Sequence, residues 1–309
     1  MNERIVFLGT PKLAADCLEG LIKAGFDIVG VITKEDKVRG RNGKVEESEV
    51  AKVARKYSLP LFKPHRLNTD HDFLYELKPD LLLTFAYGQI VNDEILSLAK
   101  YKPLNLHGSL LPKYRGAAPI QYALLNGEKE TGVSLMEMVH EMDAGDIYAV
   151  KSFAIDEKDN YTSLSEKISK CGLELAIEAL PKYFRGELTP IKQDQEKVTF
   201  THMIKKEQEK LDLNASSKDF INQVRALSLT PGGYLLHGNE ILKIYQASFL
   251  NDKVEGKVGE IILAHKKQII LQLKDGQVLL ELLQRPGKKM MGASDFNNGV
   301  KDFQGAVLQ

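Results

Sequence analysis

The chain has 309 residues, of which 43% are apolar and 27% are charged, and its 42 Lys and Arg residues balance its 42 Asp and Glu residues. This length and composition favour a globular protein of two domains, and the balanced charge argues against a broadly basic nucleic-acid-binding protein, so RNA contacts would have to come from local patches. No apolar run is long enough to span a membrane, and Cys17 and Cys171 lack the spacing of a disulfide framework or a zinc site.

The first 33 residues predict a strand, a helix and a second strand. An apolar run begins at Arg4, which leaves no room for a signal or transit segment, so we expect a cytoplasmic location. The run ends at Gly9-Thr10-Pro11, where Pro11 suits the first position of a helix and Thr10 can cap it. Helical apolar spacing follows from 14 to 22, and a second buried run lies at 28–33. Because both strands are continuously apolar, they indicate a parallel sheet covered on both faces.

A β-α-β unit of this kind is also typical of dinucleotide-binding proteins. Here Gly9-Thr10-Pro11 is followed by Lys12 and Leu13. The Gly-x-Gly-x-x-Gly spacing that brings a pyrophosphate close to the backbone is therefore missing. This part of the chain argues against a nicotinamide cofactor.

Residues 34–48 show no apolar periodicity and contain two glycines, so we expect a long mobile loop. A solvated loop is one interpretation. A phosphate-binding loop is the other, because five basic residues lie within eleven positions and such a cluster suits contacts with nucleic acid. These residues are Lys34, Lys37, Arg39, Arg41 and Lys44.

The alternation of helices and strands continues to residue 91. We expect a helix at 47–57, a short strand at 60–62, a helical turn at 73–77 and a buried strand at 81–86. A loop that begins with Tyr87 and Gly88 follows this strand. Ligands in open parallel sheets bind beyond the carboxyl ends of the strands, so this loop is expected at a binding site, although Tyr87 equally suits a packing aromatic.

Residues 104–107, Leu-Asn-Leu-His, predict the end of the next strand. Asn105 and His107 are two residues apart, so their side chains leave the same face of a strand. Asp143 lies in an Asp-Ala-Gly turn after an alternating run at 133–138, and a loop carboxylate can be held over a neighbouring strand end. A lone histidine is more often structural and a lone aspartate before a glycine region is more often a turn residue. The combination predicts one site.

Longer motifs surround these side chains. Asn-x-His is followed by Ser-Leu-Leu-Pro and then by Arg-Gly-Ala-Ala-Pro-Ile-Gln, and Asp-x-Gly begins 36 residues after the histidine. Together they resemble the folate-dependent formyltransferases over essentially the whole chain, most closely the members that act on initiator tRNA. The resemblance implies 10-formyltetrahydrofolate as co-substrate and the amino group of methionine on initiator methionyl-tRNA as acceptor, in support of translation initiation.

The resemblance also implies roles for residues at matching positions. Formyl transfer to an amine needs a stabilised oxyanion and a proton transfer, which Asn105, His107 and Asp143 can supply without a metal or a covalent intermediate. The residues expected to hold the folate are Ser109, Leu110, Leu111, Pro112, Tyr87 and Gly88. Those expected to bind tRNA are Arg39, Arg41, Lys44, Lys206 and Lys210. A cis Leu111–Pro112 bond, a monomer and no membrane association are also expected.

The rest of the chain predicts a second domain. A helix at 121–125, strands at 132–138 and 147–155 and a long helix at 163–184 complete an α/β, Rossmann-like, mostly parallel sheet with helices on both faces in a formyltransferase catalytic domain at 1–188. Residues 189–208 have the polar composition of a linker. A helix and then short strands with regular turn signals predict a smaller OB-like β-barrel domain at 209–309.

Two other classes of function remain open. A formyltransferase that acts on an amino-sugar nucleotide or another small amine would share Asn105, His107 and Asp143. A folate-binding or RNA-binding module without catalysis is the third class, and the presence of all three polar side chains argues against it.

Overall fold

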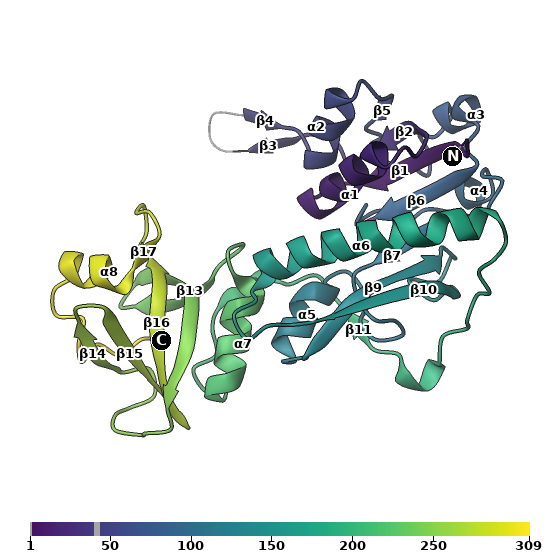
Figure 1. Cartoon of the computed structure of the whole chain (residues 1–309). Coiled ribbons are helices and arrows are strands. Elements are labelled where there is room, and N and C mark those ends of the chain that lie inside the picture. Colours follow the sequence, from purple (N-terminus) through teal and green to yellow (C-terminus); the bar gives the residue numbers. More distant parts are fainter. Residues whose placement is uncertain (1, 40–43) are drawn as a thin grey trace. The chain divides into compact units, whose positions relative to one another are not determined.

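The computed structural model of the chain describes residues 2–39 and 44–309 (Figure 1). It divides into two compact units. The N-terminal unit consists of Met1–Pro119, Glu130–Ala154 and Ser165–Thr201, and the C-terminal unit consists of Ile120–Lys129, Ile155–Leu164 and His202–Gln309. Within the described residues, no helix combines the length and the apolar character that a membrane crossing requires.

A seven-stranded sheet forms the centre of the N-terminal unit, in the order β10-β9-β7-β6-β1-β2-β5. Five neighbouring strands, from β5 to β7, run parallel, and β9 and β10 are antiparallel additions at one edge. The mostly parallel α/β sheet predicted from the continuous apolar strands is confirmed. The strands are β1 Ile5–Gly9, β2 Ile28–Ile32, β5 Leu61–Phe62, β6 Leu81–Phe85, β7 Leu104–His107, β9 Glu130–Glu137 and β10 Ile147–Ala154.

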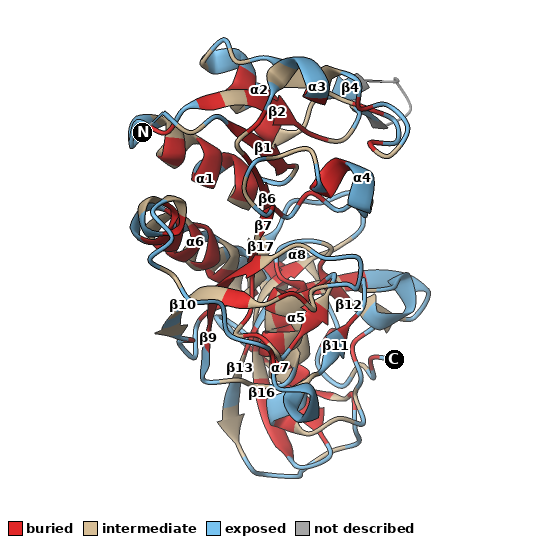
Figure 2. Ribbon diagram, turned by 90° about the vertical axis from the view of Figure 1, so that its right-hand side faces the viewer, coloured by how far each residue is buried: buried red, intermediate tan, exposed pale blue. Residues whose placement is uncertain are grey.

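Helices cover both faces of this sheet. On one face, Leu82 of β6 packs in a core cluster with Leu74 of α3 and Ile95 of α4. On the other face, Gly172 of α6 lies so close to the Phe85 ring that a Cβ would come within 2.9 Å of it. Figure 2 shows the buried residues of α1 and α6. The helices of this unit are α1 Lys12–Lys23, α2 Glu49–Lys56, α3 Phe73–Leu77, α4 Asp93–Leu96 and most of α6 Tyr161–Phe184. The helix α5 Pro119–Leu125 belongs to the C-terminal unit from Ile120 onward.

The start of α1 differs from the prediction. Pro11 occupies the N-cap position and no side chain caps the helix. The Thr10 hydroxyl instead donates a hydrogen bond to the Tyr87 carbonyl oxygen, at 3.0 Å. The predicted Thr10 cap is therefore wrong, because the hydroxyl satisfies a carbonyl on the loop after β6 and joins the carboxyl ends of two neighbouring strands.

The expected loop at 34–48 contains a β-hairpin. β3, Lys37–Arg39, pairs antiparallel with β4, Lys44–Glu46, so that Lys37 lies opposite Glu46 and Arg39 opposite Lys44. The prediction of a loop without regular structure is wrong. Backbone hydrogen bonds can hold strands this short without an apolar face, so hydropathy gave no signal.

An antiparallel sheet and two helices form the C-terminal unit beyond residue 209. The strand order is β12-β13-β16-β15-β14, with β17 paired to β16. Phe220 and Val224 of α7 pack in the core cluster over this sheet, together with Phe296 of α8. The elements are α7 Ser217–Leu227, β12 Gly233–His237, β13 Glu240–Asn251, β14 Ile261–His265, β15 Gln268–Leu273, β16 Gly276–Gln284, β17 Met291–Gly292 and α8 Ala293–Gly299.

The last residues of the chain bridge the two edge strands of this sheet. Gln309 exchanges two backbone hydrogen bonds with Leu236 of β12, at 2.6 and 2.9 Å, and the Leu308 amide donates to the Gly259 carbonyl just before β14, at 2.8 Å. The described residues show no direct pairing between β12 and β14. The structure thus establishes the antiparallel sheet. The predicted OB-like barrel would in addition require closure of this sheet between its two edges.

Leu308 should therefore contribute strongly to stability. Its side chain is 1% exposed within the core cluster, whereas Val307 is 45% exposed. We expect Leu308→Ala to lower the free energy of unfolding by about 2 to 4 kcal/mol through lost burial and a cavity. The control Val307→Ala should stay within about 0.5 kcal/mol. Urea denaturation measures both, and equal losses would contradict the assigned packing.

Candidate active site

Strand β7 places Asn105 and His107 on one face of the sheet. Asn105 pairs with Thr84 of β6, and His107 pairs with Ser134 of β9, so these side chains share a face. Leu104 and Leu106 are buried on the opposite face. Among the side chains that the structure describes, none forms a recorded hydrogen bond with the half-buried Asn105 amide. It can therefore donate to a ligand without losing a protein partner.

The His107 ring is held between a backbone carbonyl and a carboxylate. Its Nε2 donates to the Tyr114 carbonyl oxygen at 2.8 Å, and its Nδ1 lies 3.5 Å from Asp143 Oδ2. A carbonyl oxygen can only accept, so Nε2 carries a proton. The ring is 6% exposed. Nδ1 is therefore the nitrogen that faces Asp143 and can take part in chemistry.

Asp143 reaches this position from the loop between β9 and β10. Its φ of 52° is left-handed, which is strained for a residue with a Cβ. One carboxylate oxygen accepts a hydrogen bond from the Gly116 amide, at 2.8 Å. Gly145 completes the turn, where a Cβ would lie 2.1 Å from the Glu137 carbonyl oxygen. The loop is thus built to hold the carboxylate over β7.

Ser134 of β9 fixes the segment that follows His107. Its hydroxyl donates to the Ser109 carbonyl oxygen at 2.8 Å and accepts from the Leu111 amide at 3.1 Å. The Leu111–Pro112 bond is cis, as predicted from the resemblance. Ser109 and Leu111 are buried and Leu110 and Pro112 are half-buried, so this segment packs against the rest of the unit next to β9.

The part of the chain with linker composition also contributes to the site. β11, Phe200–Thr201, pairs with β8, Arg115–Gly116. The Thr199 hydroxyl accepts from the Tyr114 amide at 2.8 Å, which fixes the carbonyl that holds His107. Short 3₁₀ helices at Gln195–Lys197 and Lys206–Glu209 flank this strand.

Two residues that the sequence reasoning missed lie behind the Asp143 loop. Gln193 donates to the carbonyl oxygens of Asp143 and Gly145, and Arg115 donates to Gln193. Arg115 was visible only as part of a longer motif. Gln193 is a polar residue in a polar run, so composition gave no signal for its burial.

The predicted folate residues after β6 fall in different environments. Tyr87 is 1% exposed and packs in the core cluster with Leu82, and burial raises its pKa to about 12. Its hydroxyl is buried without a hydrogen-bond partner among the described residues. Gly88 faces Lys34, whose Nζ would lie 2.7 Å from an added Cβ. The structure therefore places Tyr87 as a packing aromatic and Gly88 on the surface of a cavity.

That cavity has a volume of about 630 Å³ and lies at the carboxyl ends of the parallel strands. Its lining includes Lys34, His65, Arg66, Gly88 and Gln89. Burial and the nearby Lys37 lower the pKa of Lys34. The cavity is basic, and His65 is paired with the Glu35 carboxylate at 2.8 Å.

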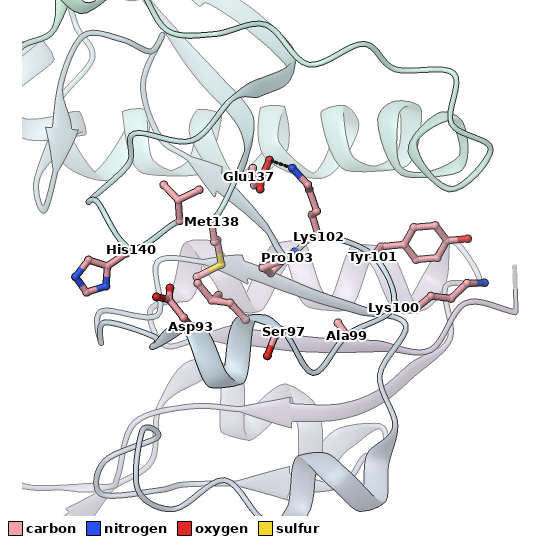
Figure 3. Close-up of a pocket in the computed structure, with 12 residues that line it drawn as sticks. Asp93, Ser97, Ala99, Lys100, Tyr101, Lys102, Pro103, Glu137, Met138 and His140 are labelled. Carbon is pink, nitrogen blue, oxygen red and sulfur yellow. Dashed lines mark hydrogen bonds and ion pairs between the residues drawn. The ribbon is translucent and has the colours of Figure 1, made fainter.

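A second cavity, of about 400 Å³, is lined by Pro103, just before β7, and by Glu137 and Met138 at the end of β9 (Figure 3). Met138 lines it, and its sulfur accepts a hydrogen bond from the hydroxyl of Thr84, the residue paired with Asn105, at 3.1 Å. Lys102 and Glu137 form an ion pair at 2.9 Å in the lining. Other lining residues are Asp93, Leu96, Ser97, Val139 and His140. This mixed apolar and polar cavity adjoins the face that carries the candidate catalytic residues.

The predicted tRNA contacts are only partly within the described structure. Lys206 and Lys210 are exposed. Arg39 and Lys44 lie opposite each other in the hairpin backbone, and Arg41 lies outside the described residues. In the part of the chain that is described, no group of three or more His, Cys, Asp or Glu residues is arranged to hold a metal.

Comparison with protein families decides the class of protein. A family model described as formyl transferase matches residues 3–180, and one described as formyl transferase, C-terminal domain, matches residues 203–301. The chain belongs to the formyl transferase family. Both matches together span most of its length.

Relatives of similar length share this family. A methionyl-tRNA formyltransferase from Lactobacillus johnsonii is 43% identical over 299 residues, which cover 96% of this chain and 95% of that protein. One from Mesoplasma florum is 40% identical over 303 residues, which cover 97% of each.

Solved structures confirm the α/β formyltransferase fold. HypX from Aquifex aeolicus, in complex with tetrahydrofolic acid, has a TM-score of 0.69 and 20% identity over 99% of this chain and 49% of that chain. An N-formyltransferase from Helicobacter canadensis, in complex with folinic acid and dTDP-3-aminofucose, has a TM-score of 0.66 and 21% identity over 92% of this chain and all of that one. At these identities the similarity concerns the fold alone.

Proposed function

We propose that this formyl transferase moves the formyl group of 10-formyltetrahydrofolate to the amino group of methionine on initiator methionyl-tRNA. The observation that carries the proposal is the similarity to proteins named methionyl-tRNA formyltransferase, which are 37–43% identical over 96–98% of the chain. Asn105, His107 and Asp143 support it, since an amide, an imidazole and a carboxylate are the groups that metal-free acyl transfer to an amine needs.

The donor supplies a formyl carbon bonded to nitrogen, and the three side chains act on its transfer. Asn105 donates to the formyl oxygen, where negative charge develops as the amine attacks. Asp143 attracts the proton that the attacking nitrogen must lose, and His107 shares it through Nδ1, because Nε2 is committed to the Tyr114 carbonyl. The new C–N bond forms, the bond to the folate nitrogen breaks, and that nitrogen takes up a proton.

The cavity lined by Pro103 and Met138 is the proposed site of the folate ring system. Its volume of about 400 Å³ and its mixture of apolar walls with polar groups suit a flat heterocycle. The proposed donor site also includes the segment Ser109, Leu110, Leu111 and Pro112 and the loop at Gly88. Tyr87 acts behind that loop as a buried support.

Basic side chains outside this cavity are proposed to bind the tRNA. The β3–β4 hairpin projects from the N-terminal unit (Figure 1), and its strands contain Arg39 and Lys44. Arg41 lies between them in the sequence, outside the described residues. Lys206 and Lys210 are exposed in the segment before α7. Their contacts would be with phosphates, so they would add affinity more than sequence specificity.

The domain boundaries and the barrel are also part of the proposal. The family matches end at residue 180 and resume at residue 203, which supports a catalytic domain at 1–188, a linker at 189–208 and a second domain at 209–309. The backbone hydrogen bonds from Leu308 and Gln309 to both edges of the sheet support an OB-like barrel closed by the C-terminal residues.

An amino-sugar nucleotide is the alternative acceptor, favoured by the fold similarity to enzymes such as the Helicobacter canadensis N-formyltransferase. Purified protein should be incubated with 10-formyltetrahydrofolate and either charged initiator tRNA or dTDP-3-aminofucose, and both tetrahydrofolate release and the formylated product should be measured. We expect formylation of the methionyl-tRNA only. Formylation of only the sugar nucleotide would reject the proposed acceptor.

His107→Ala should lower kcat by about 10² to 10⁴-fold, because it removes the group that shares a proton with Asp143. Donor binding should change little, since the proposed donor cavity is not lined by His107. Single-turnover formylation and a folate-binding titration test both parts. His265, which is exposed in β14, provides the control His265→Ala with unchanged turnover. Unchanged turnover in His107→Ala would exclude the imidazole from the mechanism.

Ser97→Phe should test the donor cavity. Ser97 is an exposed residue of its lining that follows α4, so a phenyl ring can enter the cavity without disturbing the core. We expect KM for the donor to rise at least about tenfold, equivalent to about 1.4 kcal/mol of binding, while KM for the tRNA and the melting temperature stay constant. Ser97→Ala is the control. A selective rise in KM for the tRNA would place the donor elsewhere.

A further inference from the structure

Gln193 is a buried side chain in the segment between the two family matches. It is 7% exposed. Its Nε2 donates to the carbonyl oxygens of Asp143 and Gly145, each at 2.8 Å, so both amide hydrogens are used on the Asp143 loop. Ile191 exchanges two backbone hydrogen bonds with Ile147 of β10, each at 2.8 Å. The position of Gln193 beside the loop is therefore anchored to the sheet.

Arg115 determines how the Gln193 amide is oriented. Its guanidinium is 1% exposed, and its Nε donates to Gln193 Oε1 at 3.0 Å. A guanidinium can only donate, so the amide oxygen must face Arg115 and the NH₂ group must face the two loop carbonyls. Arg115 therefore excludes the flipped orientation, in which the amide oxygen would oppose the carbonyl oxygens of Asp143 and Gly145.

The remaining contacts of Arg115 are weaker. Nη1 lies 3.5 Å from Oε1 of Glu141, whose side chain is 73% exposed, and Nη2 has no hydrogen-bond partner among the described residues. A cation this deeply buried depends on its hydrogen-bond acceptors. The Gln193 oxygen is its closest recorded side-chain acceptor.

The Asp143 loop needs such support. Asp143 has the strained φ of 52°, and a residue in this conformation keeps it only where surrounding contacts hold it. The only recorded hydrogen bond of its carboxylate within the described residues comes from the Gly116 amide. The two hydrogen bonds from Gln193 hold the backbone on either side of Ala144, and so set the direction in which the carboxylate leaves the loop.

We propose that Gln193, oriented by Arg115, is a positioning residue that holds the Asp143 carboxylate over His107 Nδ1. This inference rests on the proposed role of Asp143 in formyl transfer. Both ends of the Gln193 amide are occupied by protein groups, so the residue acts through the loop and does not touch the reacting atoms.

Gln193→Glu separates this role from folding. The carboxylate still accepts from Arg115 and forms an ion pair with it, but it loses both donors and places an oxygen against the loop carbonyls. A misplacement of about 1 Å in a catalytic group can cost about 100-fold in rate, so we expect kcat to fall by about that factor. KM for the donor and for the tRNA should stay within about threefold, since neither proposed binding surface includes Gln193.

Gln268→Glu is the control, because Gln268 is exposed in β15 of the C-terminal unit and receives the same change in charge. It should keep the wild-type kcat. Arg115→Met replaces the buried cation with an apolar side chain of similar length. This single variant should lower kcat as Gln193→Glu does, whereas the control variant should not. Titration with tetrahydrofolate gives the fraction of folded, binding-competent protein, by which kcat is corrected. A corrected kcat within twofold of the wild type in Gln193→Glu would overturn the proposal.

Hydrogen exchange of the peptide at 139–146 in the ligand-free protein tests the same contact without turnover. We expect at least about tenfold faster exchange in Gln193→Glu than in Gln268→Glu, because Gln193→Glu loses two of the hydrogen bonds that order the loop. If the wild type fails to formylate methionyl-tRNA while this difference is present, the proposed function fails and the support of the loop stands. Equal exchange in the two variants would reject the support of the loop, whatever the activity.

Discussion

The hydrogen bond from His107 Nε2 to the Tyr114 carbonyl oxygen is the interaction on which the candidate site depends. It determines which ring nitrogen carries a proton and therefore which one faces Asp143. Tyr114, which supplies this carbonyl, has a left-handed φ of 63°. A distant part of the chain holds Tyr114 in place, because its amide donates a hydrogen bond to the Thr199 hydroxyl. The orientation of the His107 ring thus depends on three segments: β7, the segment that contains Tyr114, and the segment that contains Thr199, 85 residues after Tyr114.

The features that the sequence predicted correctly depend on local patterns. Continuous apolar runs predicted the parallel strands, because a strand covered on both faces needs apolar side chains on both. The run Leu104–His107 forms β7, and its alternation brings Asn105 and His107 to one face. The cis Leu111–Pro112 bond was predicted only through the resemblance, since an X-Pro bond by itself does not specify its isomer.

The features that the sequence did not predict depend on contacts between distant segments. A hydroxyl before a helix caps it in most local patterns, but Thr10 donates instead to Tyr87. Gln193 lies in a polar run, and only the pairing of β8 with β11 and of Ile191 with Ile147 brings that run against the Asp143 loop. The paired segments are too short to show a periodic pattern of apolar residues, so the sequence alone gave no sign of either pairing.

The contacts of the candidate site are self-contained within the N-terminal unit. Among the described residues, the side chains of His107 and Asp143 contact Tyr114, Gly116 and each other, and Gln193 holds the Asp143 backbone; all belong to that unit. In the described part of the chain, the contacts that orient these two side chains therefore involve no residue of the C-terminal unit. The same fold occurs in an enzyme crystallised with an amino-sugar nucleotide, so the fold does not by itself determine the acceptor.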